Sequence, residues 1–413
     1  DLPRAEQLAD RPHSAGIGAT ARLHQRCSRV AIRAPQPTAT IDVGMLDTGA
    51  YPTTPLPPLG NAGTEQAGRL VEGRRMASYV IGPWQVDPNL IGGGSAGTVV
   101  ITDRKQLGSV LWPAIAAGAW SQPFIVAFSS ERGAAGPNGP TALRNAVLRF
   151  ATADTAAATA QAMSSTAMNM PVTTNTDSPI PVEPIRSVPI PGHPDINGAL
   201  LTRREGDKNV HELTVISAQG PYVLTQVAQS ALGPDAAAAF AGRALDLQVP
   251  LIDRFQPTDP ARFADISLDP TGLLARTLPL KTEGSSMSNA TYDPPGALHL
   301  EDNPIQAERA FTDAGVDVAS IGQTSVYQAR DPDSAQQLSD ALGDDTAHGA
   351  TSQPAPAVPG LSQSRCLRID QEGGLIPRYW CIATVGRFAV KAVARQLDNA
   401  HQQIAAQYRI LAG

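Results

Sequence analysis

HELTVISAQGPYVLTQVAQ, residues 211–229, and PRYWCIATVGRFAVKAVAR, residues 377–395, are two copies of one pattern. At a constant offset, Gly220 falls on Gly386 and Tyr222 falls on Phe388. Each copy is an alternating apolar run, a glycine and a second alternating run, and alternation with a period of two is typical of a half-buried strand. Each copy therefore predicts a β-hairpin with glycine at its turn, followed by an Ala-rich helix.

A weaker echo precedes each copy. AVLRFATADTAAATAQAM at residues 146–163 is similar to SVYQARDPDSAQQLSDAL at residues 325–342, with Asp154 falling on Asp333. In both stretches a strand-like run leads into a helical one. Self-similarity of this kind indicates a repeated structural unit.

The repeat predicts an α+β fold of two similar sheet-plus-helix domains arranged as a pseudo-repeat, each sheet carrying helices on one face. We expect an irregular N-terminal arm at residues 1–40, a first α+β domain at 41–275 and a second at 276–413. Long Pro-rich stretches at residues 168–194 and 351–360 predict extended connectors, because proline restricts the backbone and cannot donate to a sheet.

Composition limits the functional class. The chain of 413 residues has a formal net charge of -6, and only 17% of its residues are charged. A nucleic-acid-binding protein would show a basic run or patch, and the sequence has none. No apolar run approaches the length of a transmembrane helix, and residues 1–24 lack the apolar core of a signal peptide. Either the chain is a mature form whose signal has been removed, or the protein never had one. We expect the first, an exported chain without a membrane span, open to peripheral membrane association.

Two of the three cysteines also indicate a location outside the cytoplasm. Cys366 and Cys381 stand on either side of Glu372-Gly373-Gly374, which predicts a hairpin turn. Cysteines opposed on paired strands come within disulfide reach, and the bridge would stabilise the fold by roughly 3 kcal/mol. The alternative is two free thiols in a reducing compartment. A disulfide predicts an extracytoplasmic location, in the cell envelope or secreted.

Several segments resemble a known family. They are LDTGAYPTTP (46–55), LVEGRRMASYVIGPWQVDPNL (70–90), FIVAFSSER (124–132), ALRNAVLRF (142–150), DNAHQQIAAQYRIL (398–411) and the cysteine pair around Tyr379-Trp380. The chain resembles the uncharacterised secreted envelope lipoproteins of mycolic-acid-bearing actinobacteria across residues 41–411. The resemblance implies an exported, usually lipid-anchored protein of two domains with no established activity, and it supplies no catalytic residues.

Cys27 departs from the pattern of such lipoproteins. It stands about where an acylated cysteine would be expected, yet the preceding Leu23-His24-Gln25-Arg26 lacks the small residues of a lipobox. Three interpretations stay open, namely a lipid anchor, a free or intermolecular thiol, and a buried cysteine.

Signals for catalysis and metal binding are weak. Gly93-Gly94-Ser95-Ala96-Gly97 fits the G-x-S-x-G elbow of serine hydrolases, but a strand-like run follows it where the elbow needs a helix. The seven histidines are scattered, so we expect no metal and no cofactor. His299 is interpreted as part of a helix start, with Asp302 or Asn303 as the cap before Pro304.

The remaining candidates are aromatic. Trp84, Trp112, Trp120 and Trp380 either line a ligand or partner surface or anchor a core. We expect a non-catalytic, exported cell-envelope protein that binds a partner protein or an amphiphilic envelope ligand held between its halves. The alternatives are an accessory subunit of a membrane-associated complex and an envelope serine hydrolase with Ser95 as nucleophile.

Overall fold

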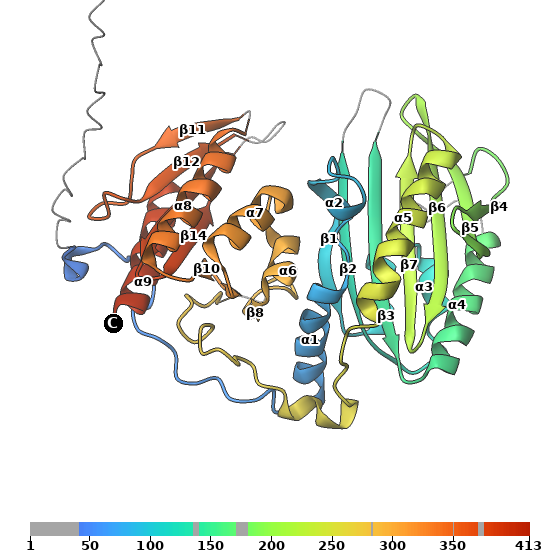
Figure 1. Cartoon of the computed structure of the whole chain (residues 1–413), viewed down its shortest axis with the longest axis horizontal. Helices are drawn as coiled ribbons and strands as arrows, with labels where there is room; N and C mark the ends of the chain where they lie inside the picture. The colour runs from blue at the N-terminus through green and yellow to red at the C-terminus, as the bar shows by residue number, and fades with distance from the viewer. Residues whose placement is uncertain (1–40, 135–139, 171–180, 282–283, 350, 371–375) are drawn as a thin grey trace, which may run out of the picture. The chain divides into compact units, whose positions relative to one another are not determined.

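The structure, a computed structural model, contains two seven-stranded antiparallel sheets (Figure 1). It describes residues 41–134, 140–170, 181–281, 284–349, 351–370 and 376–413. The predicted N-terminal arm with Cys27, and the predicted turn at residues 372–374, lie outside the described residues. The fold class is therefore confirmed as α+β with two sheets.

The first sheet follows the order β1-β2-β3-β7-β6-β5-β4. Its strands are β1 (Gly92–Ile101), β2 (Phe124–Ala134), β3 (Thr141–Phe150), β4 (Arg186–Ile190), β5 (His193–Glu205), β6 (Lys208–Gln219) and β7 (Tyr222–Ser230). Sequential strands are mostly neighbours, and the exception is β7, which returns to pair with β3.

The second sheet repeats that order. Its strands are β8 (Ala290–Tyr292), β9 (Val318–Ile321), β10 (Ser325–Gln328), β11 (Ser352–Ala355), β12 (Arg365–Ile369), β13 (Arg378–Val385) and β14 (Phe388–Ala394). From its β8 edge the sheet runs β8-β9-β10-β14-β13-β12-β11. The two sheets therefore match strand for strand, with β14 returning to β10 as β7 returns to β3.

The repeated stretches form the same hairpin twice. β6 and β7 meet at Gly220, and β13 and β14 meet at Gly386; both glycines have φ of 52°. This left-handed conformation favours glycine, because a Cβ would approach the carbonyl oxygen. A helix follows each hairpin, as the sequence predicts: α5 (Pro234–Ile252) and α9 (Leu397–Ala412).

The weaker echo corresponds to a strand followed by a helix in both halves. In the first half β3 leads into α4 (Ala153–Met168), and in the second β10 leads into α8 (Pro332–Ala347). Thr152 caps α4 and Asp331 caps α8, each accepting a hydrogen bond from a backbone N–H three residues later.

Helices cover both faces of each sheet, so the expectation of helices on one face is wrong. In the first sheet Val215 packs with α5 while Ile216 packs with α4. In the second, Ile382 packs with α8 and Cys381 with α9. The reason is visible in β3, whose residues 145–150 are all buried, as in a strand enclosed on both sides.

The remaining helical elements frame the sheets. They are η1 (Val43–Met45), α1 (Glu65–Arg75), η2 (Met76–Tyr79), α2 (Pro83–Val86), η3 (Arg104–Ser109), α3 (Pro113–Ala117), η4 (Pro260–Asp265), α6 (Pro294–Ala297), η5 (Leu298–Leu300) and α7 (Pro304–Ala314). Thr64 caps α1 through a hydrogen bond from the Ala67 N–H. In the described part of the chain, no helix has the length and apolar character that crossing a membrane requires.

Cys366 and Cys381 form a disulfide. They occupy directly opposed positions on β12 and β13, and their Cα atoms lie 4.1 Å apart. Both residues are buried beneath α9. The bridge therefore joins two strands that the hydrogen-bond ladder already holds in register.

Candidate functional site

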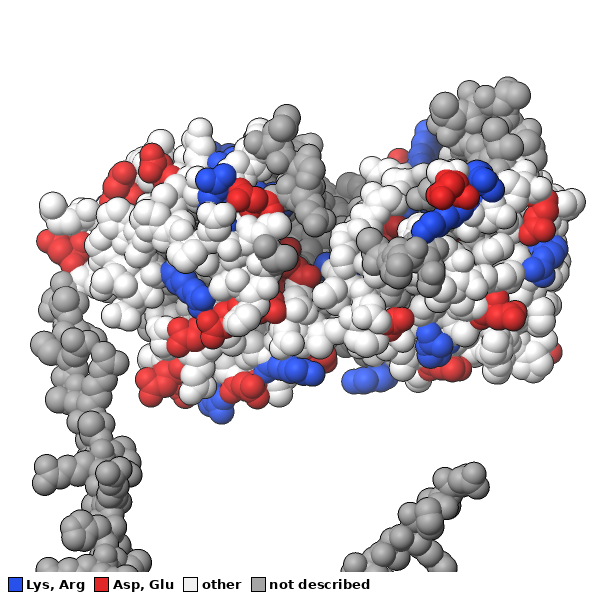
Figure 2. All heavy atoms as spheres, turned by 90° about the horizontal axis from the view of Figure 1, so that it is seen from above, with Lys and Arg blue, Asp and Glu red and all other residues white. Residues whose placement is uncertain are grey.

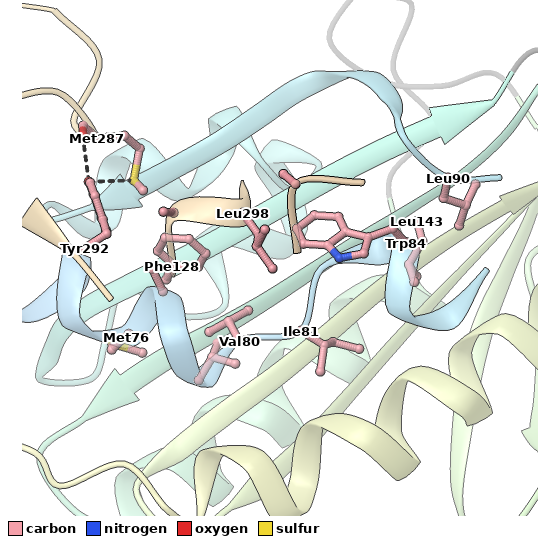
Figure 3. Close-up of a cluster of buried hydrophobic side chains, with 14 of the residues drawn as sticks. Met76, Val80, Ile81, Trp84, Leu90, Phe128, Leu143, Met287, Tyr292 and Leu298 are labelled. Carbon is pink, nitrogen blue, oxygen red and sulfur yellow. Dashed lines mark hydrogen bonds between the residues drawn. The ribbon is translucent and has the colours of Figure 1, made fainter. Parts of the chain in front are cut away.

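The first candidate region is the junction, which we define as the contact between residues 285–301 and the elements α1, η2, α2, β1 and β2. Its apolar side chains form one cluster with contributions from both halves (Figure 3). Met287, Tyr292 and Leu298 come from the second half. The cluster is completed by residues of the first half, among them Met76, Val80, Ile81, Trp84, Leu90, Phe128 and Leu143. The two halves therefore share a core.

His299 lies at the centre of the junction. Its ring packs edge-on against Trp84 and Phe128, with centroids 5.1 and 5.0 Å away. Nε2 lies 3.0 Å from the carbonyl oxygens of Ala77 and Val80, so the proton is assigned to Nε2. Nδ1 then accepts a hydrogen bond from the Ser130 hydroxyl at 2.9 Å. Burial lowers the pKa of His299 to about 4, so the ring is neutral near pH 7.

This placement revises the interpretation of His299 as part of a helix start. Asn303 does cap α7, accepting a hydrogen bond from the Gln306 N–H. His299, four residues earlier, instead carries the polar contacts that bind the second half to η2 and β2. Sequence alone could not bring Ser130 and the η2 carbonyls to its ring.

Two arginines of the first half bind backbone carbonyls of the second. Arg132 donates to the carbonyl oxygens of His299 and Glu301 at 2.9 and 2.8 Å, and its guanidinium lies over the Trp84 ring. Arg74 donates to the carbonyls of Ser286 and Ser288 at 2.8 and 2.6 Å. Burial lowers the pKa of both arginines. Charge-assisted bonds to buried carbonyls fix the path of residues 286–301 against the first sheet.

A buried ion pair lies at Glu301, the last residue of the junction segment. The Glu301 carboxylate accepts hydrogen bonds from Lys391 Nζ at 2.6 Å and from the Tyr327 hydroxyl at 2.5 Å. Burial alone would lower the pKa of Lys391, but the adjacent Glu301 carboxylate together with Tyr327 and Asp302 outweighs burial and raises it. Burial and the same carboxylate raise the pKa of Tyr327. Lys391 is therefore charged and held by its partner.

The junction also encloses space. A cavity of about 420 Å³ lies between α1, the connector at residues 266–271 and β8. Its lining combines apolar residues, among them Val71, Tyr79 and Leu268, with charged ones, among them Arg75 and Asp293. A neighbouring hollow of about 340 Å³ shares the lining residues Ser78, Tyr79 and Asp293 and extends to Trp84 and His299. We call the two together the junction cavity.

The second candidate region is the polar pocket, a cavity of about 360 Å³ on the α4 side of the first sheet. At one end the buried Glu131 carboxylate accepts hydrogen bonds from the Ala96 N–H at 2.9 Å and from Arg144 at 2.6 and 3.0 Å. At the other end the buried Glu212 carboxylate accepts from the Trp112 indole N–H and from Gln229. Arg203 lies 3.6 Å from Glu212. Two ion pairs therefore frame this pocket.

Ser95 lies at the rim of the polar pocket. Its hydroxyl donates to Glu131 at 3.1 Å and accepts from Arg144 at 3.3 Å. The G-x-S-x-G motif lies within β1, at an irregularity in the pairing with β2 between Gly93 and Thr98, and not on a strand-to-helix turn. Its backbone N–H groups bind the Glu131 carboxylate. The motif therefore serves as a bulge that holds a carboxylate.

Two protein-family models match the chain, and together they cover most of it. The N-terminal part of DUF7373, a domain of unknown function, matches residues 59–268. The C-terminal part of the same domain matches residues 273–413. The chain belongs to the DUF7373 family. No curated protein matches it.

One solved structure is similar to part of this DUF7373 protein. It is the extracellular domain of PknH from Mycobacterium tuberculosis, with 15% identity over 44% of this chain and 97% of that domain, and a TM-score of 0.31. A likeness of that size carries no argument about function. The resemblance to envelope lipoproteins thus stands as a family of unknown function, and the lipid anchor stays a prediction.

The four tryptophans of the DUF7373 protein lie in four surroundings. Trp84 lines the junction cavity and Trp112 lines the polar pocket. Trp380 is buried in the core beneath α8, and Trp120 is 46% exposed after α3. The structure therefore does not gather them into one groove, and it leaves Trp84 and Trp112 as the two that line cavities.

The polar pocket contains residues that the motif search missed. Arg144 and Glu212 line it and stand within largely apolar strands. The signal that could have found them is a charged residue at an inward-facing position of an otherwise apolar strand, which is rare unless the charge is paired.

Among the described residues, one group of side chains in the second half has the spacing of a metal site. Cys366, Cys381 and His401 offer ligand atoms within 4.8 Å of one another. The two sulfurs are bonded to each other, however, and thiolates are the form of cysteine that binds metals. His401 contacts the carbonyl oxygen of Pro356 at 2.9 Å.

Proposed function

We propose that the protein is an exported, non-catalytic cell-envelope protein that binds an amphiphilic ligand in the junction cavity. The observation that carries the proposal is a cavity lined by both parts of the family domain, with apolar and charged residues together in its lining. Ligand sites are commonly found between domains, and they combine mostly apolar lining with a few placed polar groups.

The composition of the cavity favours an amphiphile of modest size. Tyr79 and Leu268 offer an apolar surface, while Arg75, whose side chain is 42% exposed and paired with Glu72, adds a polar group to the lining. The Trp84 Nε1–H is buried and has no acceptor among the described residues. A ligand with one apolar segment and an acceptor-bearing head would satisfy these groups.

The surface gives no comparable support for a strongly charged partner. On the face shown in Figure 2, basic and acidic side chains are interspersed, with no continuous field of one sign. Complementary patches of one sign are what accelerate association between charged macromolecules. The amphiphile is therefore the occupant that we favour over a partner protein.

The disulfide supports export. Disulfides persist in oxidising compartments outside the cytoplasm and are rare inside it. The Cys366–Cys381 bridge is buried and links facing strands, which is typical of a structural bond. We infer the cell envelope, or secretion, as the location.

The surroundings of Ser95 favour binding over hydrolysis. A serine nucleophile needs a base that can take its proton. The carboxylate beside Ser95 already accepts hydrogen bonds from the Arg144 guanidinium and the Ala96 N–H. The carboxylate is therefore already the acceptor of an ion pair and of backbone N–H groups, and it serves as a structural partner of Ser95.

A matched pair of variants tests the proposal. Dodecanoate would be titrated into the intact protein in competition with the fluorescent amphiphile 1-anilinonaphthalene-8-sulfonate. Thr291 lines the cavity on β8, and its side chain is partly exposed. Thr291→Trp should weaken binding by about tenfold or more, whereas Thr291→Val keeps the shape and should bind normally.

Three results would overturn the proposal. One is that dodecanoate fails to displace the dye, and another is that Thr291→Trp binds as tightly as Thr291→Val with an unchanged Tm. The third is labelling of Ser95 by a fluorophosphonate probe, which would establish the hydrolase alternative. Co-purification from membranes with a partner of fixed stoichiometry, without dodecanoate binding, would instead establish the accessory subunit.

A further inference from the structure

We propose that the polar pocket of the first sheet is a second ligand site, and that it takes a neutral, polyhydroxylated ligand of the size of a mono- or disaccharide. This site is separate from the junction cavity and uses other residues. Its lining comes from β1, β3, β5, β6, β7 and the loop around α3.

The charges of the pocket are neutralised inside it. Arg144 is paired with Glu131 at 2.6 Å, and Arg203 lies beside Glu212. Two cations and two anions leave no net charge for a ligand to balance. A phosphate or carboxylate would have to displace a buried glutamate, and a cation would have to displace a partly buried arginine, so a neutral ligand is favoured.

The pocket nevertheless contains many polar groups. Ser95, Ser109 and Thr214 contribute hydroxyls, and Gln229 contributes an amide. These groups both donate and accept, as the hydroxyl groups of a sugar do. Ser95, Ser109 and Gln229 each have a protein partner, in Glu131, the Gln106 carbonyl and Glu212. An apolar ligand would remove water from their remaining hydrogen-bonding capacity, at a cost in free energy for each group desolvated.

Trp112 provides the aromatic component. Its indole N–H is bonded to the Glu212 carboxylate, so the ring is fixed and only its carbon surface remains available to a ligand. A fixed ring beside hydroxyl and amide groups suits a molecule that is apolar on its C–H face and polar at its rim. A sugar ring has that character.

The repeat shows that the space is specific to the first half. Thr214 pairs with Val227 across β6 and β7, and Trp380 pairs with Val393 at the same place across β13 and β14. On the opposite neighbouring strand, Thr214 pairs with Ala199 of β5, whereas Trp380 pairs with Leu367 of β12. Large side chains therefore fill this position in the second half and small ones leave it open in the first. A further hollow of about 320 Å³ beside α4 is lined by the same Ala199 and Thr214.

Nuclear magnetic resonance of the indole N–H groups tests the site in the whole chain. Trp112 would be assigned by the signal that Trp112→Phe removes. Glucose, galactose, mannose, arabinose and maltose would then be titrated separately. At least one should shift the Trp112 signal in a saturable manner, while inorganic phosphate, glutamate and ethanolamine at equal concentration should not.

The repeat suggests a substitution that should block the polar pocket. Thr214→Trp places in the first half the residue that fills the second, and it should weaken sugar binding by about tenfold or more with an unchanged Tm. Thr214→Val keeps the volume and should bind within about threefold of the parent. If Thr214→Trp fails to fold, Ser109→Trp at the exposed rim is compared with Ser109→Ala.

The outcomes separate this site from the junction cavity. Thr291→Trp should leave sugar binding unchanged, and Thr214→Trp should leave dodecanoate binding unchanged. The proposal is overturned if no sugar shifts Trp112, if the blocked variants retain binding, or if a charged ligand binds more tightly than every sugar.

Discussion

The two halves share one topology and differ in how they are filled and reinforced. Both have seven strands in the same order, and both turn their central hairpin at a glycine with φ of 52°. Only the second half has a disulfide. On the sheet face that α8 covers, the second half also has the buried Trp380. The first half keeps a polar pocket at that place. Positions that the halves share encode packing, and positions that differ carry the candidate binding chemistry.

Strand length explains the unequal reinforcement. β5 and β6 in the first half have 13 and 12 residues, while β12 and β13 have 5 and 8. A shorter ladder contributes fewer backbone hydrogen bonds. At the position of Cys381 the first half has Val215, and Gly198 lies beside it, where an added Cβ would stand 3.0 Å from the Val215 side chain. The long sheet thus does without a covalent link.

The largest expected effect is at the buried ion pair. Lys391 pairs with Ile382 where Thr225 pairs with Ile216, so the second half has a charge where the first has a hydroxyl. Lys391→Met leaves Glu301 charged and buried without its partner. The free energy of unfolding should fall by about 3–5 kcal/mol, measured by urea denaturation.

A double variant separates the lost pair from lost packing. Glu301→Gln combined with Lys391→Met removes both charges and should recover a large part of the loss. In the first half, Thr225→Val should cost about 1 kcal/mol or less. Equal effects of Lys391→Met and Thr225→Val would contradict the distinction between the halves.

The next effect concerns the junction and depends on pH. Burial lowers the pKa of His299 to about 4 in the folded protein, below the ordinary value of 6.5 for histidine. Between these values the unfolded chain binds more protons, so stability falls as pH drops through this window. The loss at pH 4 should be roughly 3 kcal/mol, since each unit corresponds to about 1.4 kcal/mol.

A histidine control makes the pH prediction specific. His299→Gln should be less stable near pH 7 and should lose the stability step between pH 6.5 and 4. His348→Gln, on the exposed end of α8, should retain it. Thermal denaturation across this range measures both. A step of unchanged size in His299→Gln would show that other groups cause the acid response.

Local patterns in the sequence predict some features of this fold, and long-range packing determines the others. Hairpins, helix caps and the disulfide follow from local patterns, because the period of two and the turn glycine act within a few residues. The pairing of β7 with β3 brings Arg144 beside Val227, and no local pattern predicts it. His299, expected near a helix start, reached Ser130 by the same long-range packing. The Trp84 and Trp112 candidates were found by residue type, but their separate cavities depend on tertiary structure.

A third prediction removes the covalent difference between the halves. Cys366→Ala with Cys381→Val should lower the free energy of unfolding by about 3 kcal/mol, because the closed loop no longer restricts the unfolded chain. Dithiothreitol should lower the Tm of the parent and leave the variant unchanged. Equal denaturation midpoints for parent and variant would show that the short sheet needs no bridge.

The smallest effect tests the feature that the halves share. An added Cβ at Gly220 or Gly386 meets no atom within 4 Å, so Gly→Ala at either turn changes only the backbone preference. Gly386→Ala should cost about 1 kcal/mol in urea denaturation. Gly220→Ala should cost slightly more, because Pro221 follows it and restricts the preceding residue further. Costs that differ by more than about 1 kcal/mol would show that the turns are not equivalent, and the repeat would then be one of strand order rather than of conformation.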